Sequence, residues 1–238
     1  MKDELDAAWA VRPIELNGER DRPTPVLEDP GGEPLARLLG SPLEMELFLT
    51  LAIGIAGALG KVHQRGLIHK DLKPANILVG SADGHVRLTG FGIVSRLSRE
   101  RQAPEPPETI AGTLAYMAPE QTGRMNRSID SRSDLYALGI TLYEMLTGSL
   151  PFLASNPMEW VHCHTARQPV PPSRRLENVP APVSAIVMKL RLARDQGHRA
   201  PFFRRAFLTA LPRVSRPQPR SQKGESSAPR RRRQVQGR

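Results

Sequence analysis

Residues 69–78 read HKDLKPANIL, and the rest of the chain is most readily interpreted outward from this stretch. It contains a carboxylate at Asp71, a cation two residues later at Lys73 and a carboxamide at Asn76. The apolar residues 77–79 that follow are typical of a short buried strand. Phosphoryl transfer requires such a set, because a carboxylate accepts the hydroxyl proton, a cation balances developing charge and an oxygen binds Mg²⁺. An ordinary polar loop before a strand is the alternative interpretation.

A second motif lies about forty residues further on, where residues 112–120 read GTLAYMAPE. It ends a polar, proline-rich segment, 95–107, of the kind that forms mobile surface loops. Considered without the first motif, Thr113 would be interpreted as an ordinary turn residue. The two motifs together resemble the catalytic loop and the end of the activation segment of protein kinases, with Lys70 in place of the usual arginine. Lys73 is typical of the serine/threonine class.

The resemblance spans about residues 5–190 and implies an α+β, protein-kinase-like fold. It predicts mostly the helical C-lobe, with the last strands of the N-lobe before it. It implies transfer of phosphate from ATP to Ser or Thr hydroxyls of a protein substrate. In that reaction Asp71 is the base, Lys73 stabilises charge, Thr113 hydrogen-bonds near both of them, and Asn76 is the ligand of Mg²⁺.

Two further acidic residues receive structural roles from the same resemblance. Glu120 is expected to pair with a buried arginine further along the chain. Asp134 is expected to brace the backbone of the catalytic loop, and a carboxylate inside so apolar a helix would be costly without such partners.

The expected adenine-binding segment consists of Glu28, Asp29 and Pro30, which follow a predicted strand. In a kinase, this segment is the hinge that holds adenine through backbone groups. A strand that ends in a Pro-Gly-Gly turn is the alternative.

The sequence departs from the kinase pattern at Gly90, since residues 89–92 read TGFG where the family has Asp-Phe-Gly. The missing aspartate is the residue that grips the Mg²⁺ bridging the ATP phosphates. Metal binding therefore depends on Asn76, phosphate oxygens and water. A catalytically inactive pseudokinase module that relays signals by docking is the alternative function.

Residues 110–126 resemble more particularly the N-terminal kinase domain of large bacterial hybrid proteins. Those proteins join it to an ATPase module, a GAF domain and a sensor histidine kinase, and they share the Gly-Phe-Gly variant. Other domains of a larger signalling protein are thus expected partners, in the cytoplasm. The family's glycine-rich loop, strand lysine and helix glutamate are not found before residue 5. We therefore expect an N-terminally truncated fragment that by itself transfers phosphate poorly.

Charge is distributed unevenly along the 238 residues. The formal net charge is +10, but residues 191–238 alone contain fourteen Lys and Arg against two acids. We predict a kinase-like domain at 1–190 and a basic, disordered tail at 191–238, read out of frame or unrelated to the domain. A basic arm for nucleic acid or for an acidic membrane is the alternative, but no nucleic acid is expected because the body carries no excess of positive charge.

The predicted elements follow from periodicity and from helix-end signals. A helix is expected to begin with Ser41 as its N-cap and to end at residues 65–66, followed by apolar helices near 131–148 and 183–190 and a helix across 158–161. Residues 3–11 read as a helix end, with strands at 12–16 and 24–29. The longest apolar run, 47–60, is too short to span a bilayer, so no membrane segment is expected.

The histidines on either side of Cys163 suggest a metal site, but neighbouring side chains on one element do not converge on an ion. Cys163 is the only cysteine, which excludes an intrachain disulfide and fits a reducing cytoplasm.

Overall fold

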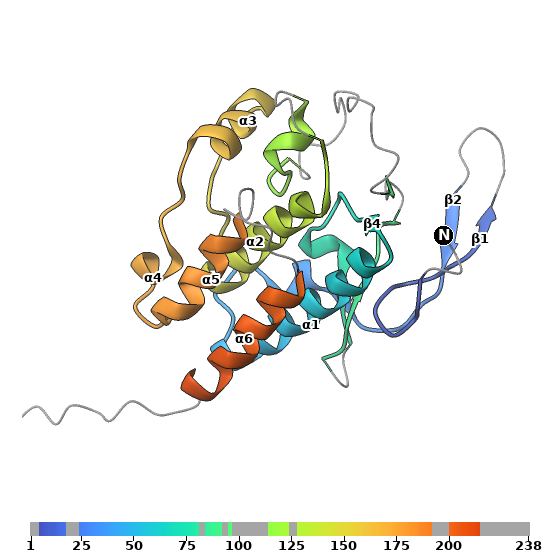
Figure 1. The fold of residues 1–238 in the computed structure, drawn as a ribbon, viewed down its shortest axis with the longest axis horizontal. Coiled ribbons are helices and arrows are strands. Elements are labelled where there is room, and N and C mark those ends of the chain that lie inside the picture. The colour runs from blue at the N-terminus through green and yellow to red at the C-terminus, as the bar shows by residue number, and fades with distance from the viewer. Residues whose placement is uncertain are drawn as a thin grey trace, which may run out of the picture.

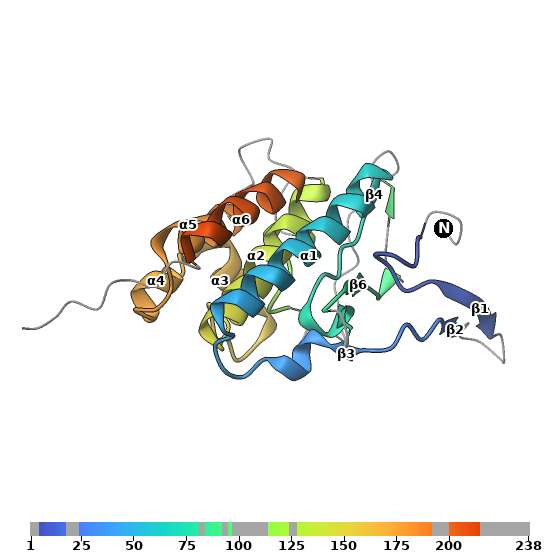
Figure 2. The same cartoon turned by 90° about the horizontal axis from the view of Figure 1, so that it is seen from below.

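A computed structural model describes residues 5–17, 24–80, 84–91, 95–96, 114–123, 128–191 and 200–214. A body of helices makes up most of it, and a hairpin projects from one side (Figures 1 and 2). The mixture of helices with small sheets confirms the predicted α+β class.

The projecting hairpin consists of β1 (Pro13–Asn17) and β2 (Thr24–Leu27), which pair antiparallel. Both strands were expected, whereas the predicted turn at residues 17–18 extends beyond the described residues. The expected helix end before them is wrong for residues 5–11. Trp9 instead ends a turn and Ala10 follows it, both residues are buried, and the Trp9 carbonyl accepts a hydrogen bond from the Leu88 amide at 2.9 Å. Pairing with a distant strand has replaced the local helix.

A three-stranded antiparallel sheet adjoins the helical body, in the order β3 (Glu33–Pro34), β5 (Ile77–Val79), β6 (Val86–Leu88). A 3-10 helix, η2 (Leu35–Leu38), follows β3. In this sheet β5, which directly follows residues 69–76, pairs with β3, which lies before the first long helix. A two-residue strand, β4 (Leu67–Ile68), leads into the loop at residues 69–76, the predicted catalytic loop, and pairs with β7 (Ser95–Arg96).

Helix α1 (Met45–Gln64) lies in the centre of the core, with ten of its residues buried. It begins four residues after the predicted N-cap Ser41, because Leu43 donates its amide to the Met145 carbonyl at 2.9 Å and stays outside the helix. Its predicted end at residues 65–66 is confirmed. The helix is long and apolar enough to cross a membrane by length and composition, but 56% of that stretch is buried within the fold, as in a core helix.

Helix α2 (Ser131–Thr147) packs beside α1 (Figure 2). Its bounds agree with the helix predicted near 131–148. Asp130 caps it by accepting the Arg132 amide at 2.8 Å, and Gly148 ends it in the left-handed conformation. Helices α3 (Pro157–Ala166), α4 (Pro172–Arg175) and α5 (Ala181–Arg191) complete this part of the chain. The predicted helices near 158–161 and 183–190 are thereby confirmed, each somewhat longer than expected.

The prediction of a disordered tail is wrong for residues 200–214, which form α6 (Ala200–Val214). In both overall views α6 lies along α1 (Figures 1 and 2). Its buried residues recur at helical spacing and face the core: Ala200, Phe203, Phe207 and Ala210. The Phe207 ring meets Phe48 of α1 edge to face, with ring centroids 6.1 Å apart. The folded body therefore extends past the predicted boundary at residue 190.

Candidate functional site

The loop between β4 and β5 brings three of the predicted site residues together. Lys73 Nζ lies 3.0 and 2.8 Å from the two Asp71 carboxylate oxygens. Asn76 Nδ2 donates to Asp71 Oδ2 at 2.8 Å and to the Asp71 carbonyl at 2.7 Å. Asp71 and Lys73 are each about one-fifth exposed, so a ligand can reach this carboxylate.

The orientation of the Asn76 amide follows from its partners. Both atoms that it meets on Asp71 are acceptors, so its nitrogen must face Asp71 and its oxygen must face away. Near that amide is Gly90, whose φ is +81°. A Cβ built there would lie 2.6 Å from Asn76 Cγ and Nδ2, which is closer than the amide as placed can tolerate. The missing side chain at Gly90 therefore leaves room for the Asn76 amide to bind Asp71.

Asp134 of α2 braces the loop, as the sequence predicts. Its carboxylate is buried and accepts the backbone amides of His69 at 2.9 Å and Lys70 at 2.8 Å. His63 of α1 adds a ring nitrogen at 2.8 Å. Burial alone would raise the pKa of Asp134, but the hydrogen bond and charge of His63, aided by His69, outweigh it and hold that pKa below its usual value.

His69 is a structural member of the loop. Its Nε2 lies 2.9 Å from the Thr89 carbonyl, which can only accept, so Nε2 carries the proton and Nδ1 accepts the Asp71 amide at 3.3 Å. Its ring also contacts Phe91, with centroids 4.9 Å apart. Burial lowers the pKa of His69, because the charged form would be desolvated. The next residue, Lys70, has a φ of +68°, which is a strained backbone conformation for a lysine. The hydrogen bonds around the loop hold Lys70 in this conformation.

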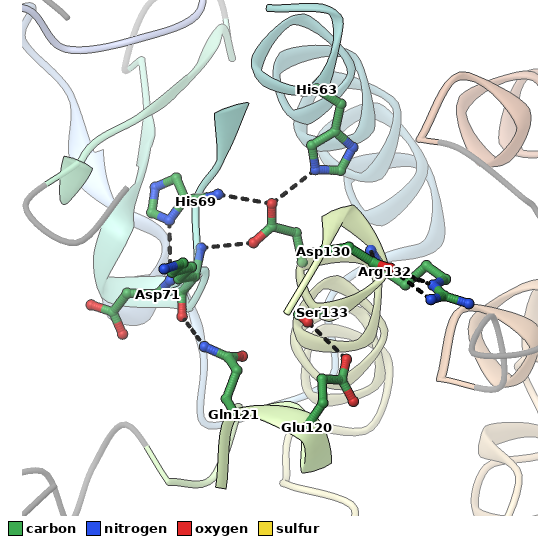
Figure 3. A network of polar contacts seen from close by, with 10 residues as sticks. His63, His69, Asp71, Glu120, Gln121, Asp130, Arg132 and Ser133 are labelled. Atoms are coloured by element: carbon green, nitrogen blue, oxygen red, sulfur yellow. Dashed lines mark hydrogen bonds and ion pairs between the residues drawn. The ribbon is translucent and has the colours of Figure 1, made fainter. Parts of the chain in front are cut away.

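Residues 114–123 approach the catalytic loop from the other motif. Gln121 donates its side-chain amide to the Lys70 carbonyl at 2.8 Å (Figure 3). Tyr116 donates its hydroxyl to Glu144 of α2 at 2.6 Å. Burial, followed by the hydrogen bond to Glu144, raises the pKa of Tyr116, and burial raises the pKa of Glu144. Thr113 lies outside the described residues.

The expected arginine partner of Glu120 is not found in the described part of the chain. There the buried Glu120 carboxylate accepts the Ser133 hydroxyl at 2.7 Å and forms no ion pair (Figure 3). Arg194 and Arg199 lie outside the described residues, so an arginine partner for Glu120 stays a prediction. Glu120 joins the 3-10 helix η5 (Pro119–Thr122) to the first turn of α2 through a neutral donor.

The three predicted adenine-contacting residues, Glu28, Asp29 and Pro30, lie between β2 and β3. The Glu28 carboxylate accepts Arg12 Nε at 2.9 Å, and Asp29 Oδ1 accepts the Gly31 amide at 2.9 Å. The Asp29 side chain thus stabilises the local turn, and the Glu28 side chain links this segment to the residue before β1. Binding of adenine by the backbone of residues 28–30 stays a prediction.

A cavity of about 520 Å³ lies elsewhere, between α1, α6, β6 and the segment at Trp9. Its lining includes Trp9, Gly57, Lys61 and Arg204 but no residue of the catalytic loop. In the described residues, no group of three or more His, Cys, Asp or Glu side chains could hold a metal ion. The geometry at Asp71, not this cavity, defines the candidate site.

Several residues that shape the site were not singled out from the sequence. His63 and Gln121 bond to the loop or its brace from elements far away in the chain. A histidine in the last turn of an apolar helix was the available signal for His63. Nothing in the sequence distinguished Gln121 from an ordinary surface residue.

The mixture of helices with small sheets and the arrangement of the Asp71 loop are those expected of a protein-kinase-like domain. Comparison with protein families matches residues 7–200 to the protein kinase domain. The chain belongs to the protein kinase family.

Its relatives carry the name serine/threonine-protein kinase, which supports the class expected from Lys73. The chain is 39% identical over 142 residues to PknB of Mycolicibacterium smegmatis, covering 60% of this chain and 22% of that protein. It is 32% identical over 203 residues to Pkn1 of Myxococcus xanthus, covering 83% and 29%. The chain thus spans under a third of the length of these relatives.

Proposed function

We propose that this chain transfers the terminal phosphate of ATP to Ser or Thr hydroxyls of a protein substrate within bacterial signalling. The convergence of Lys73 and Asn76 on the Asp71 carboxylate carries the proposal. Asp71 accepts the proton of the attacking hydroxyl and Lys73 balances the charge that develops on the transferred group. Thr113 assists near both residues, in keeping with the resemblance to the family.

ATP and Mg²⁺ are the proposed cofactors, and the residues present can accommodate the ion. Mg²⁺ usually keeps several waters and takes one or two protein oxygens together with substrate phosphates. Asn76 would supply its amide oxygen, which faces away from Asp71, and Gly90 supplies no side chain. When bound, the ion neutralises phosphate charge. Glu28, Asp29 and Pro30 would hold adenine through their backbone.

The proposed setting is a larger cytoplasmic protein in which other domains are the partners. The resemblance of residues 110–126 to hybrid proteins with ATPase, GAF and histidine kinase modules supports this arrangement. Within it, we propose that the kinase domain includes α6 and that the basic segment after residue 214 lies outside the domain.

A docking module without catalysis is the second candidate function. Gly90 favours it, because the space that an aspartate would need is taken by the Asn76 amide. In this case the segment at 114–123 and the loop at Asp71 would bind a partner protein and would catalyse no reaction.

The deciding experiment measures incorporation of radiolabelled phosphate into histone H1 in the presence of Mg²⁺ or Mn²⁺. It is run on the 238-residue chain and on a fusion that places a kinase glycine-rich loop and strand lysine ahead of residue 5. The 238-residue chain should transfer little, and in the fusion Asp71→Asn should lower incorporation by about 10²–10⁴-fold, the usual contribution of a general base. Glu177→Gln, the same change of carboxylate to amide at an exposed site, should have no effect.

Nucleotide binding separates the two candidates. Calorimetric titration that detects no ATP binding by the fusion, together with no Asp71-dependent incorporation, would reject catalysis and leave the docking module. Incorporation that depends on Asp71 would reject the docking module as the sole function.

A further inference from the structure

His164 is a buried residue of α3 that the catalytic roles above do not use. Its residue exposure is 2%, although α3 is a short helix near the surface. Nδ1 lies 2.7 Å from the Tyr136 hydroxyl of α2, and Nε2 lies 2.7 Å from the Leu114 carbonyl oxygen. One imidazole therefore connects three segments that are well separated along the chain.

The chemistry of these partners determines the tautomer. A carbonyl oxygen can only accept, so Nε2 carries the proton and donates to Leu114. In the neutral ring Nδ1 is then an acceptor, and the Tyr136 hydroxyl donates to it. Both ring nitrogens are satisfied in the uncharged form, which is the form that burial favours.

Aromatic neighbours hold the ring in one orientation. Trp160 stacks on it, with centroids 5.6 Å apart and planes inclined by 18°. Phe152 and Tyr136 meet it edge to face at 5.9 and 5.7 Å. A ring packed on several sides cannot turn to follow a moving carbonyl. Its hydrogen bond therefore fixes the backbone position of Leu114.

Leu114 is the residue directly after Thr113, and it begins the segment 114–123. The far end of that segment is tied to the catalytic loop, because Gln121 donates to the Lys70 carbonyl at 2.8 Å. Lys70 precedes Asp71. The segment is thus held by α3 at one end and by the catalytic loop at the other, so a shift of Leu114 would move the segment relative to that loop.

We propose that His164 is a positioning residue for phosphoryl transfer: by donating to the Leu114 carbonyl it sets the position of residues 114–118 relative to the Asp71 loop and so controls how a substrate hydroxyl is presented. The inference rests on the proposed function. The bonds around Asn76 and Gly90 do not involve this segment in the described residues, so nucleotide binding should not depend on His164.

Two substitutions of similar size separate the effect of the hydrogen bond to Leu114 from the effect of ring packing. In His164→Gln the side-chain amide reaches the position of Nε2 and can still donate to Leu114. In His164→Asn the shorter amide reaches only the position of Nδ1, so it keeps the Tyr136 contact and loses the Leu114 bond. Both lose the stacked ring equally. His162→Asn, at an exposed site on the same helix, is the matched control.

The first readout is amide hydrogen exchange in the 238-residue chain. The reporters are the amides of Met117 and Ala118, which bond to the Leu114 carbonyl at 3.4 Å and to Gln121 Oε1 at 3.2 Å. Exchange at these amides should rise about tenfold in His164→Asn, the effect of losing one buried hydrogen bond. His164→Gln should stay within about twofold of the wild-type chain, and His162→Asn should equal it.

The second readout is histone H1 phosphorylation by the fusion described above. His164→Asn should raise the KM for histone about tenfold with the KM for ATP unchanged, and His164→Gln should restore it. Equal exchange at Met117 and Ala118 in the Gln and Asn variants would overturn the inference, and so would equal changes in both KM values. If the wild-type fusion shows no transfer, the proposed function fails while the exchange comparison still decides whether His164 positions the segment.

Discussion

Among single residues, Gly90 shapes the catalytic loop through both its backbone conformation and its missing side chain. Its positive φ and the 2.6 Å approach to Asn76 act together. A side chain at 90 would be strained by the backbone, and it would also displace the amide that binds Asp71. The sequence shows the lost aspartate, but only the structure shows that Asn76 uses the space beside it. An aspartate restored at 90 would therefore have to move Asn76 before both could share an ion.

We predict that Gly90→Ala lowers the free energy of unfolding by more than backbone strain alone. The left-handed conformation costs about 1–2 kcal/mol for alanine, and the displaced Asn76 hydrogen bonds cost about 1 kcal/mol more. Urea unfolding measures the loss. Gly66→Ala is the matched control, because Gly66 has a φ of +68° and nothing within 4 Å of a built Cβ.

A double-mutant cycle tests the mechanism of this loss. In Gly90→Ala with Asn76→Ala the clash is absent, so the combined cost should fall short of the sum by about 1 kcal/mol. Gly66→Ala with Asn76→Ala should be additive. Additivity in both pairs would show that Gly90 and Asn76 do not compete for space.

At the scale of elements, α6 was missed because the amino-acid composition was considered over residues 191–238 as a whole. Residues 191–238 have the composition of a disordered chain, yet the apolar residues 200, 203, 207 and 210 form one helical face. Only fifteen residues need to be ordered to bury that face. The ordering cost that argues against folding of the whole tail does not apply to this portion.

We predict that Phe207→Ala lowers the free energy of unfolding by about 3–5 kcal/mol, the usual cost of emptying a buried phenylalanine site. The ring is fully buried and packs on Phe48. Phe202→Ala is the control, because Phe202 is 48% exposed on the same helix and should cost less than about 1 kcal/mol. Thermal and urea unfolding of both variants give the comparison. Equal, small losses would mean that α6 does not contribute to the core.

Sequence reasoning succeeded where signals are local. Asp71, Lys73 and Asn76 lie within six positions of one loop, so their spacing was enough to predict that they meet. The start of α1 was misplaced because a tertiary bond from Leu43 to Met145 overrides a good capping signal at Ser41. The roles of Gln121 and His164 depend on contacts between distant segments, and one sequence carries no record of such contacts.

At the scale of the whole molecule, the site is held by contacts between elements that are far apart in sequence. The Asp134 carboxylate of α2 joins the His63 ring of α1 to the backbone of the catalytic loop, across separations of 64 to 71 residues. Gln121 adds the segment at 114–123. Loosening of α1 against α2 would therefore displace the catalytic loop, so that global stability and site geometry change together.

Acidification should accordingly destabilise the fold, and the direction follows from two pKa shifts of one sign. His69 has a folded-state pKa below the ordinary 6.5, because burial disfavours its charge. As the pH falls below about 6.5, the unfolded chain takes up a proton at this residue before the folded chain does, so the free energy of unfolding decreases. The stabilisation that His69 contributes to the folded state is complete above about pH 6.5. It is lost as the pH falls through the lower pKa that His69 has in the folded state. Asp134 acts in the same direction in a more acidic window, below its ordinary 3.8.

We therefore predict that urea unfolding between pH 8 and 4 shows a plateau above about pH 6.5 and a decline below it. The slope assigned to His69 should not exceed about 1.4 kcal/mol per pH unit, the limit for one proton. His69→Gln keeps a donor for the Thr89 carbonyl and removes the titrating ring, so this variant should lose part of the slope between pH 6.5 and 5. His162→Asn removes an exposed histidine and should retain the wild-type slope. Identical pH profiles for the two variants would show that proton uptake at His69 does not drive the acid sensitivity.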